Sequence, residues 1–188
     1  MELTSVTEAT RIILENTIDY GIEYVPFDSA NRRVLGEPLI ADRDLPPFDR
    51  VTMDGIAIQW QSYVNGQRTF RIESTQTAGE IQQTLTDSNA CIEVMTGTSL
   101  PFNTNLVIKY EDLEIKEGVA HLINTVNEGQ NIHYRGEDRV AGKPIVQPNA
   151  LLGAPEIAIA ASIGATQIGV KKLPSVVIIT SGDELVAV

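Results

Sequence analysis

The sequence predicts an α+β protein built from a helical beginning, a β-rich middle and the first strand of an α/β sheet. Three observations favour this fold class. Apolar side chains recur at helical spacing over residues 5–20, short and often alternating apolar segments fill residues 55–123, and residues 175–180 form a continuous β-branched run. Short strands at such spacing are typical of a small barrel or sandwich. A continuous apolar strand is typical of a parallel sheet that is buried on both faces.

The composition indicates a soluble globular protein and excludes several classes of function. The chain has 188 residues, enough for one large or two small domains. The longest apolar runs, residues 157–163 and 176–179, are too short to span a bilayer, and the polar start has no secretory signal pattern. The single cysteine, Cys91, excludes an internal disulfide and a multi-cysteine zinc site. It also favours the cytoplasm as the location.

The net charge of −11 argues against nucleic acid or an anionic membrane as a partner. If the substrate is nevertheless an anion, a divalent cation or a local cluster of basic side chains must offset this field.

The first element expected is a helix over residues 5–20. Ser5 and Glu8 have the spacing of a capping box, and Val6, Ala9 and Ile13 follow at helical intervals. A second, short helix is expected over residues 28–34.

The next element is a stiff loop over residues 42–57 that carries several carboxylates. Two consecutive prolines, Pro46 and Pro47, favour an extended connector, and Gly55 permits a sharp turn or the close approach of a ligand. Such a loop is suited to hold a metal ion or a reacting group, although a polar interdomain loop has the same composition. Its aspartates are Asp42, Asp44, Asp49 and Asp54.

The β-rich middle is predicted to contain strands at residues 56–60, 69–72, 91–95, 105–110, 113–115 and 119–123, with a hairpin turn at 116–118. Two glycine-bearing loops, residues 96–98 and 135–138, offer hydroxyls and backbone N–H groups that are suited to an oxyanion, although a glycine turn is more often an ordinary turn.

The last part of the chain is predicted to be a helix, a strand and then the buried strand. Pro155 opens the helix and Gly164 ends it, followed by a strand at residues 166–170. The run at 175–180 leads through Ser181 and Gly182 to Asp183 and Glu184, at the strand end where a doubly wound sheet places ligand-binding residues. They are also suited to cap a following helix. Because one strand cannot form such a sheet, a fragment of a longer protein is expected.

Five motifs occur in order along the chain: Pro46-Pro47-Phe48-Asp49, Met53-Asp54-Gly55, Met95-Thr96-Gly97, Arg135-Gly136-Glu137-Asp138 and Thr180-Ser181-Gly182-Asp183-Glu184-Leu185. Together they resemble one family, the molybdopterin molybdenumtransferases of the MoeA type, to which the E domain of gephyrin also belongs. The resemblance runs from the first helix to Leu185, with mild departures at residues 50–52 and 180–181.

The resemblance implies a multidomain plan. An elongated, helix-containing domain would comprise residues 1–43 and 144–173, with a β-rich, barrel-like domain inserted at residues 44–143. Residues 174–188 would begin a truncated α/β domain of the molybdopterin-binding type.

The resemblance also implies an activity, the insertion of molybdate into adenylylated molybdopterin with release of AMP and with Mg²⁺ as cofactor. On the matching positions, Asp54 and Glu184 would be catalytic, Thr96, Asp138 and Asp183 would bind substrate, and Asp49, Asp54 and Glu184 would hold the metal. Carboxylates that bind Mg²⁺ on a pyrophosphate would reconcile the acidic charge with an anionic substrate.

A homodimer is implied, with the molybdopterin adenylyltransferase of the same pathway as a candidate partner. Its clefts would form between subunits, so the chain alone is expected to be inactive. Two other functions stay open: a non-catalytic binding or scaffolding module of the same fold, and a generic Mg²⁺-dependent phosphohydrolase.

Overall fold

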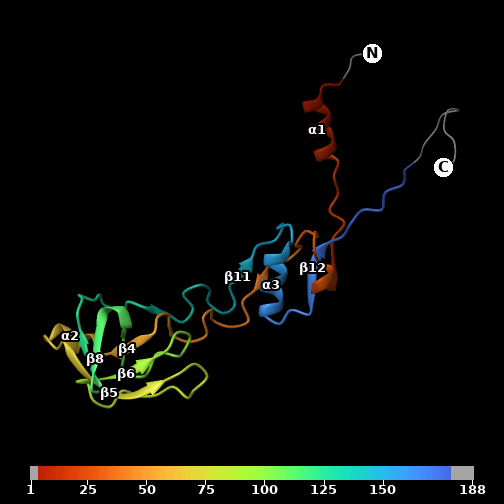
Figure 1. The fold of residues 1–188 in the computed structure, drawn as a ribbon. Coiled ribbons are helices and arrows are strands. Elements are labelled where there is room, and N and C mark those ends of the chain that lie inside the picture. The colour runs from red at the N-terminus through yellow and green to blue at the C-terminus, as the bar shows by residue number, and fades with distance from the viewer. Residues whose placement is uncertain (1–3, 179–188) are drawn as a thin grey trace, which may run out of the picture. The chain divides into compact units, whose positions relative to one another are not determined.

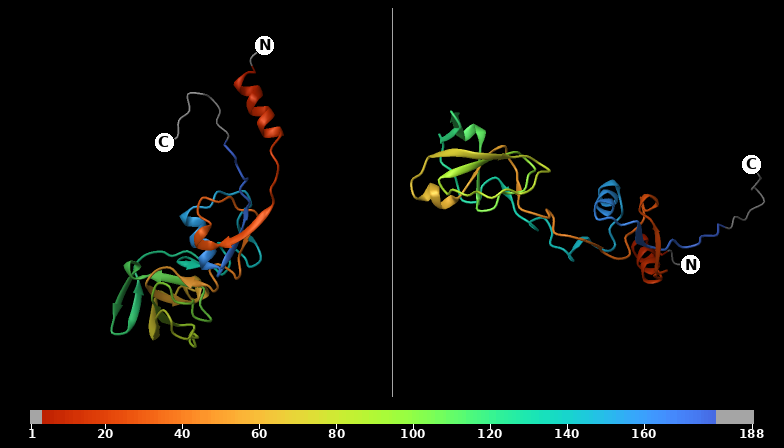
Figure 2. Two further views of the ribbon diagram at one scale, coloured as in Figure 1. Left: turned by 90° about the vertical axis from the view of Figure 1, so that its right-hand side faces the viewer. Right: turned by 90° about the horizontal axis from the view of Figure 1, so that it is seen from below.

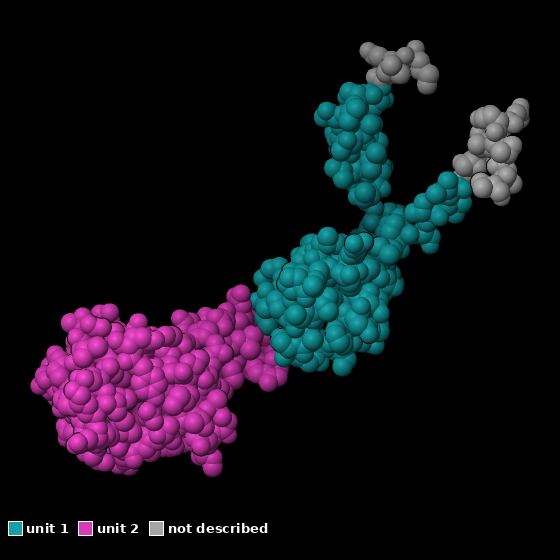
Figure 3. Space-filling view, viewed as in Figure 1, with its two compact units in different colours: residues 1–39, 144–188 teal, residues 40–143 magenta. Residues whose placement is uncertain are grey.

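The computed structural model describes residues 4–178, and the chain divides into two compact units (Figure 3). Unit 1 comprises residues 1–39 and 144–188, and unit 2 comprises residues 40–143. Within the described residues, no helix is long and apolar enough to cross a membrane.

Unit 1 begins with helix α1 (Val6–Glu15), which is shorter than the predicted helix over residues 5–20. The Glu8 backbone N–H donates to the Ser5 hydroxyl, but the Glu8 carboxylate binds Arg11, so only half of the expected capping box forms. The helix stops early because Asn16 caps it: both its backbone N–H and its side-chain amide donate to the Ile12 carbonyl oxygen.

The core of unit 1 lies between a two-stranded ribbon and helix α3 (Figures 1 and 2). Strands β1 (Ile22–Pro26) and β12 (Gln167–Lys171) pair antiparallel, and α3 (Ala154–Ser162) contributes the buried Ala160 to the same cluster as Ile168 and Val170. The predicted helix and strand at the end of the chain are thus confirmed.

The predicted helix over residues 28–34 is wrong. A single 3₁₀ turn forms at Phe27–Ser29, and Arg32 then takes a positive φ of 63°, which a right-handed helix does not permit. Val34 and Leu35 instead make isolated bridges to Leu151 and Val170.

Unit 2 contains a six-stranded mixed sheet in the order β7-β4-β6-β5-β9-β8, in which only β5 and β6 are parallel. The strand predictions for this region are confirmed, although Trp60 begins helix α2 (Trp60–Val64) rather than ending a strand. Glu117 and Gly118 both have positive φ, as the tight β8–β9 hairpin requires. The strands are β4 (Gly55–Ile58), β5 (Thr69–Gln76), β6 (Ala90–Val94), β7 (Leu106–Lys109), β8 (Leu113–Lys116) and β9 (Val119–Leu122).

Two short ribbons complete the topology. Strand β2 (Leu39–Ile40) pairs with β11 (Pro144–Val146), and β3 (Arg50–Val51) pairs with β10 (Ile132–His133).

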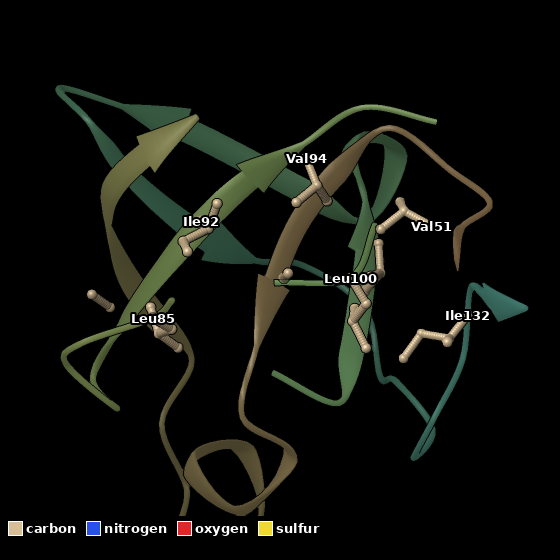
Figure 4. Packing of buried hydrophobic residues seen from close by; sticks show 9 residues of the cluster. Val51, Leu85, Ile92, Val94, Leu100 and Ile132 are labelled. Atoms are coloured by element: carbon tan, nitrogen blue, oxygen red, sulfur yellow. The ribbon is translucent and has the colours of Figure 1, made fainter. Parts of the chain in front are cut away.

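Strands β4, β6 and β7 of the unit 2 sheet are buried on both faces. Successive side chains of a strand point to opposite faces, and Ile56 and Ile58 accordingly lie in one apolar cluster while Ala57 lies in another. Figure 4 shows the second cluster, in which Val51 from β3 and Ile132 from β10 lie beside Leu100. Burial on both faces explains why β4 and β7 read as continuous apolar runs.

The strand predicted over residues 175–180 does not form in its described part. Residues 173–178 have no regular structure, and the Val176, Val177 and Ile178 side chains are exposed. A strand needs a neighbour for its backbone groups, and none of the described residues supplies one here. The rest of this segment, with Asp183 and Glu184, lies outside the described residues.

Candidate active site

One edge of the unit 2 sheet gathers residues that are far apart in the sequence. Gly55, the first residue of β4, is opposite Val94 of β6 and Lys109 of β7. Because β4 runs antiparallel to both neighbours, the residue before β4 and the residues after β6 and β7 meet at this edge. These residues are Asp54, Thr96 and Tyr110.

Thr96 holds the carboxylate of Asp54 with two hydrogen bonds. Its backbone N–H donates to Asp54 Oδ1 at 2.6 Å, and its hydroxyl donates to the same oxygen at 2.7 Å. The backbone hydrogen bond, and to a smaller extent the hydroxyl one, holds the pKa of Asp54 below its usual range. Among the described residues, none donates a hydrogen bond to Asp54 Oδ2. The carboxylate is therefore ionised, fixed in orientation, and left with one oxygen for a ligand.

Gly55 is required by strand packing, and the expectation that it permits a sharp turn is wrong. Its φ is not positive, and a Cβ at this position would lie 1.9 Å from the Ile108 carbonyl oxygen of β7. The close approach brings β7 near enough for the Tyr110 backbone N–H to donate to the Asp54 carbonyl oxygen at 3.1 Å. Gly55 thus fixes the backbone of Asp54.

The loop of residues 96–98 uses its backbone donors within the protein. Besides the bond from Thr96 to Asp54, the Gly97 N–H donates to the Val51 carbonyl oxygen and the Thr98 N–H to that of Met95. The buried amide of Gln76 donates to the Thr98 hydroxyl at 2.9 Å. The prediction that free N–H groups of this loop suit an oxyanion is therefore wrong, since these groups already have acceptors.

The backbone donors of residues 135–138 are also in use. The Gly136 and Asp138 N–H groups donate to the carbonyl oxygens of Pro46 and Leu45, and the Arg135 N–H donates to Asp49 Oδ1 at 2.8 Å. The backbone N–H groups named here for the two glycine-bearing loops are therefore not free to bind an anion.

Asp44 and Asp49 hold the aspartate loop against this second loop. Asp44 accepts from the Ala141 N–H at 2.9 Å and from Arg135 Nε at 2.6 Å, and these bonds lower its pKa. Asp49, a predicted metal ligand, has one carboxylate oxygen engaged by Arg135. Asp42 pairs with the adjacent Arg43. The four aspartates are thus not equivalent, and Asp54 is the one held at the sheet edge.

Asp138, a predicted substrate-binding residue, lies in a chain of polar contacts. His133 Nε2 is 3.0 Å from Asp138 Oδ1, and Arg50 Nη2 is 3.0 Å from His133 Nδ1. Sequence reasoning assigned no role to Arg50 or His133. Their contact joins positions 83 residues apart, which no local pattern reveals.

A further polar group lies beside Asp54 and was also missed. The Tyr110 hydroxyl donates to Glu93 Oε1 at 2.7 Å, and the Thr75 hydroxyl donates to Glu93 Oε2 at 2.8 Å. Burial is the main cause that raises the pKa of Tyr110 above its ordinary range, and the hydrogen bond to Glu93 is the second. Tyr110 is consequently a neutral anchor for this edge.

The described residues contain no group of three or more His, Cys, Asp or Glu side chains placed to hold a metal ion. One ionised carboxylate with an unengaged oxygen nevertheless suits Mg²⁺, which is commonly bound by one or two carboxylates together with waters and substrate phosphates. The donor set at Asp54 therefore fits this cation in the presence of a phosphate ligand.

Comparison with known proteins identifies the family. Residues 4–164 match the profile described as the MoeA N-terminal region (domain I and II), and the chain belongs to this family. It is 40% identical over 188 residues to the molybdopterin molybdenumtransferase of Synechocystis sp., covering 99% of this chain and 48% of that protein. It is 29% identical over 201 residues to gephyrin of Dictyostelium discoideum, covering 97% of this chain and 28% of that protein.

The solved structures agree with this assignment. A molybdopterin biosynthesis moeA protein from Pyrococcus horikoshii OT3 superposes with a TM-score of 0.80 at 28% identity, covering 90% of this chain and 46% of that one. The expected α+β fold is confirmed as a curled mixed sheet with helices that resembles domains I and II of MoeA. The chain spans about half the length of the molybdenumtransferases that it matches.

Proposed function

We propose that the protein containing this chain acts in molybdenum cofactor biosynthesis as a molybdopterin molybdenumtransferase. It would insert molybdate into adenylylated molybdopterin and release AMP. The support from relatives is the name of the Synechocystis protein, which matches 99% of this chain. The observation that carries the proposal is the state of the Asp54 carboxylate. Thr96 donates two hydrogen bonds to Oδ1, and none of the described residues donates one to Oδ2.

In this reaction the phosphoanhydride between AMP and molybdopterin is cleaved. Bound Mg²⁺ would neutralise charge on the pyrophosphate. Asp54 would hold the cation through Oδ2, and Thr96 would keep this oxygen pointed at the site. Asp138 would bind substrate, as would Asp183, while Asp49 and Glu184 complete the proposed metal set and Glu184 acts with Asp54 in catalysis.

We also propose that the chain is divided among three domains. Residues 1–43 with 144–173 would form an elongated domain, residues 44–143 a β-rich insertion, and residues 174–188 the start of a molybdopterin-binding domain. The enzyme would work in the cytoplasm as a homodimer, with the molybdopterin adenylyltransferase of the pathway as a partner. The 188-residue chain alone would have no activity, because each cleft would need a complete third domain from the dimer mate.

The test is Asp54→Asn in the full-length protein. We expect AMP release from adenylylated molybdopterin, with molybdate and Mg²⁺ present, to fall by about 10²–10³, the usual effect of removing one electrostatic contact to a transition state. The unfolding midpoint should change little, because the Thr96 donors can still bind the amide oxygen.

Asp42→Asn is the matched control, since Asp42 pairs only with the neighbouring Arg43 among the described residues. It should leave AMP release unchanged. Wild-type rates in Asp54→Asn would remove Asp54 from the mechanism, and AMP release that proceeds equally without molybdate would favour a phosphohydrolase.

A further inference from the structure

The short ribbon of β3 and β10 places one pair of polar side chains, Arg50 and His133, on its outer face. Arg50 and His133 are direct partners in the antiparallel register, as are their neighbours Val51 and Ile132. Val51 is fully buried and Ile132 is 9% exposed, and both belong to the apolar cluster drawn in Figure 4. Because alternate residues of a strand point to opposite faces, the core anchors the ribbon while Arg50 and His133 face away from it.

The chemistry of the contacts fixes the direction of the hydrogen bonds. A guanidinium group can only donate, so His133 Nδ1 accepts from Arg50 across 3.0 Å. The ring proton therefore lies on Nε2, which donates to Asp138 Oδ1 across 3.0 Å. A chain of two hydrogen bonds thus runs from Arg50 through His133 to Asp138.

The backbone of Asp138 is fixed as well, since its N–H donates to the Leu45 carbonyl oxygen at 2.9 Å. The His133 side chain is 22% exposed, whereas that of Asp138 is 63% exposed. The imidazole is thus the better buried of the two and supports a carboxylate that faces solvent. Arg135 does not compete for this role, because its Nε binds Asp44.

We propose that Arg50 and His133 are positioning residues that orient the Asp138 carboxylate toward the substrate. This rests on the proposed function, in which Asp138 binds adenylylated molybdopterin. Exposed polar contacts of this kind add little to folding stability. Their removal should therefore be measurable in substrate binding rather than in unfolding.

The test is a double-mutant cycle in the full-length protein, in which the rate of AMP release is measured for each variant. Arg50→Met and His133→Ala should each raise KM for adenylylated molybdopterin about three- to tenfold, the effect of one lost hydrogen bond, with kcat nearly unchanged. His133→Gln should restore KM, because an amide both accepts and donates. In an Asp138→Ala background, Arg50→Met should change KM by less than about twofold, because the coupling is gone.

His121→Ala is the control, because His121 lies on β9, opposite Thr69 of β5 and Glu114 of β8. It should leave KM unchanged. An equal effect of Arg50→Met with and without the Asp138 carboxylate would overturn the positioning role alone. A wild-type protein that releases no AMP would instead contradict the proposed function.

A second readout does not depend on activity. In ¹⁵N-histidine NMR spectra of the full-length protein, assigned with His133→Ala, we expect a slowly exchanging Nε2 proton on His133. This proton should exchange rapidly in Asp138→Ala. A proton on Nδ1 in the wild-type protein would contradict the proposed chain of hydrogen bonds.

Discussion

Replacing Gly55 by alanine tests how the sheet edge is built. The new Cβ would lie 1.9 Å from the Ile108 carbonyl oxygen, whereas ordinary contacts begin at 3.4 Å, so β7 must retreat by about 1.5 Å. The obstacle is backbone and cannot rotate aside. Overpacking of this kind typically costs about 1–3 kcal/mol, and each broken ladder hydrogen bond adds about 1 kcal/mol. We therefore expect a loss of about 3 kcal/mol or more.

That loss is large against a total stability of about 5–15 kcal/mol. Trp60, the only tryptophan of the chain, lies in unit 2 and stacks on Tyr63, so its fluorescence reports the unfolding of this unit in urea or on heating. For a unit of this size, about 3 kcal/mol corresponds to a Tm decrease of roughly 12–24 °C.

Gly66→Ala supplies the control. Gly66 has a φ of +98° and nothing within 4 Å of its Cβ position, so alanine there meets only backbone strain, about 1–2 kcal/mol. If Gly55→Ala lost no more stability than Gly66→Ala, the steric explanation of the Met-Asp-Gly motif would be refuted.

Two further predictions concern single side chains of unit 2. Thr96→Val should raise the pKa of Asp54 toward its usual value, measured by carboxyl ¹³C NMR, because one of two donors is lost. A lowered folded-state pKa gives stability that is lost as pH falls through it, so the wild-type protein should keep this contribution to a lower pH than Thr96→Val. Cys91 is fully buried, and desolvation raises the pKa of its thiol to about 12. It should not react with a thiol reagent at pH 8 until urea unfolds the sheet; prompt labelling of the native protein would contradict its burial.

The elements that sequence reasoning predicted well carry their signals locally. Pro155 and Gly164 mark the two ends of α3, and Glu117 with Gly118 supplies the positive φ angles of the β8–β9 hairpin. The failures depend on contacts that a local pattern does not contain. Strand β1 forms because β12, far along the chain, pairs with it. The helix expected over residues 28–34 does not form, because Arg32 takes a left-handed conformation in which its N–H donates to the Leu152 carbonyl oxygen.

In the candidate site, too, the sequence indicated individual residues but not the long-range contacts between them. The resemblance selected Asp54 and Thr96 separately, and the structure joins them across 42 residues of sequence. The resemblance could not show that Thr96 donates hydrogen bonds to Asp54, because this contact follows from the antiparallel pairing of β4 with β6. Gln76 ends strand β5, is fully buried, and donates a hydrogen bond to Thr98 in the loop of residues 96–98. The only local sign of this role was a polar residue at a buried strand position.

The hydrogen bonding of unit 2 constrains how such a site can meet an anion. The backbone N–H groups of residues 96–98 and 135–138 already donate within the protein, including to Asp54 and Asp49. Among the described residues, no donor engages the second carboxylate oxygen of Asp54 at this sheet edge, and a carboxylate repels a phosphate. We infer that an anionic substrate can approach this edge only with a bound cation or a basic side chain between the two charges. Both conditions agree with a chain whose net charge is −11.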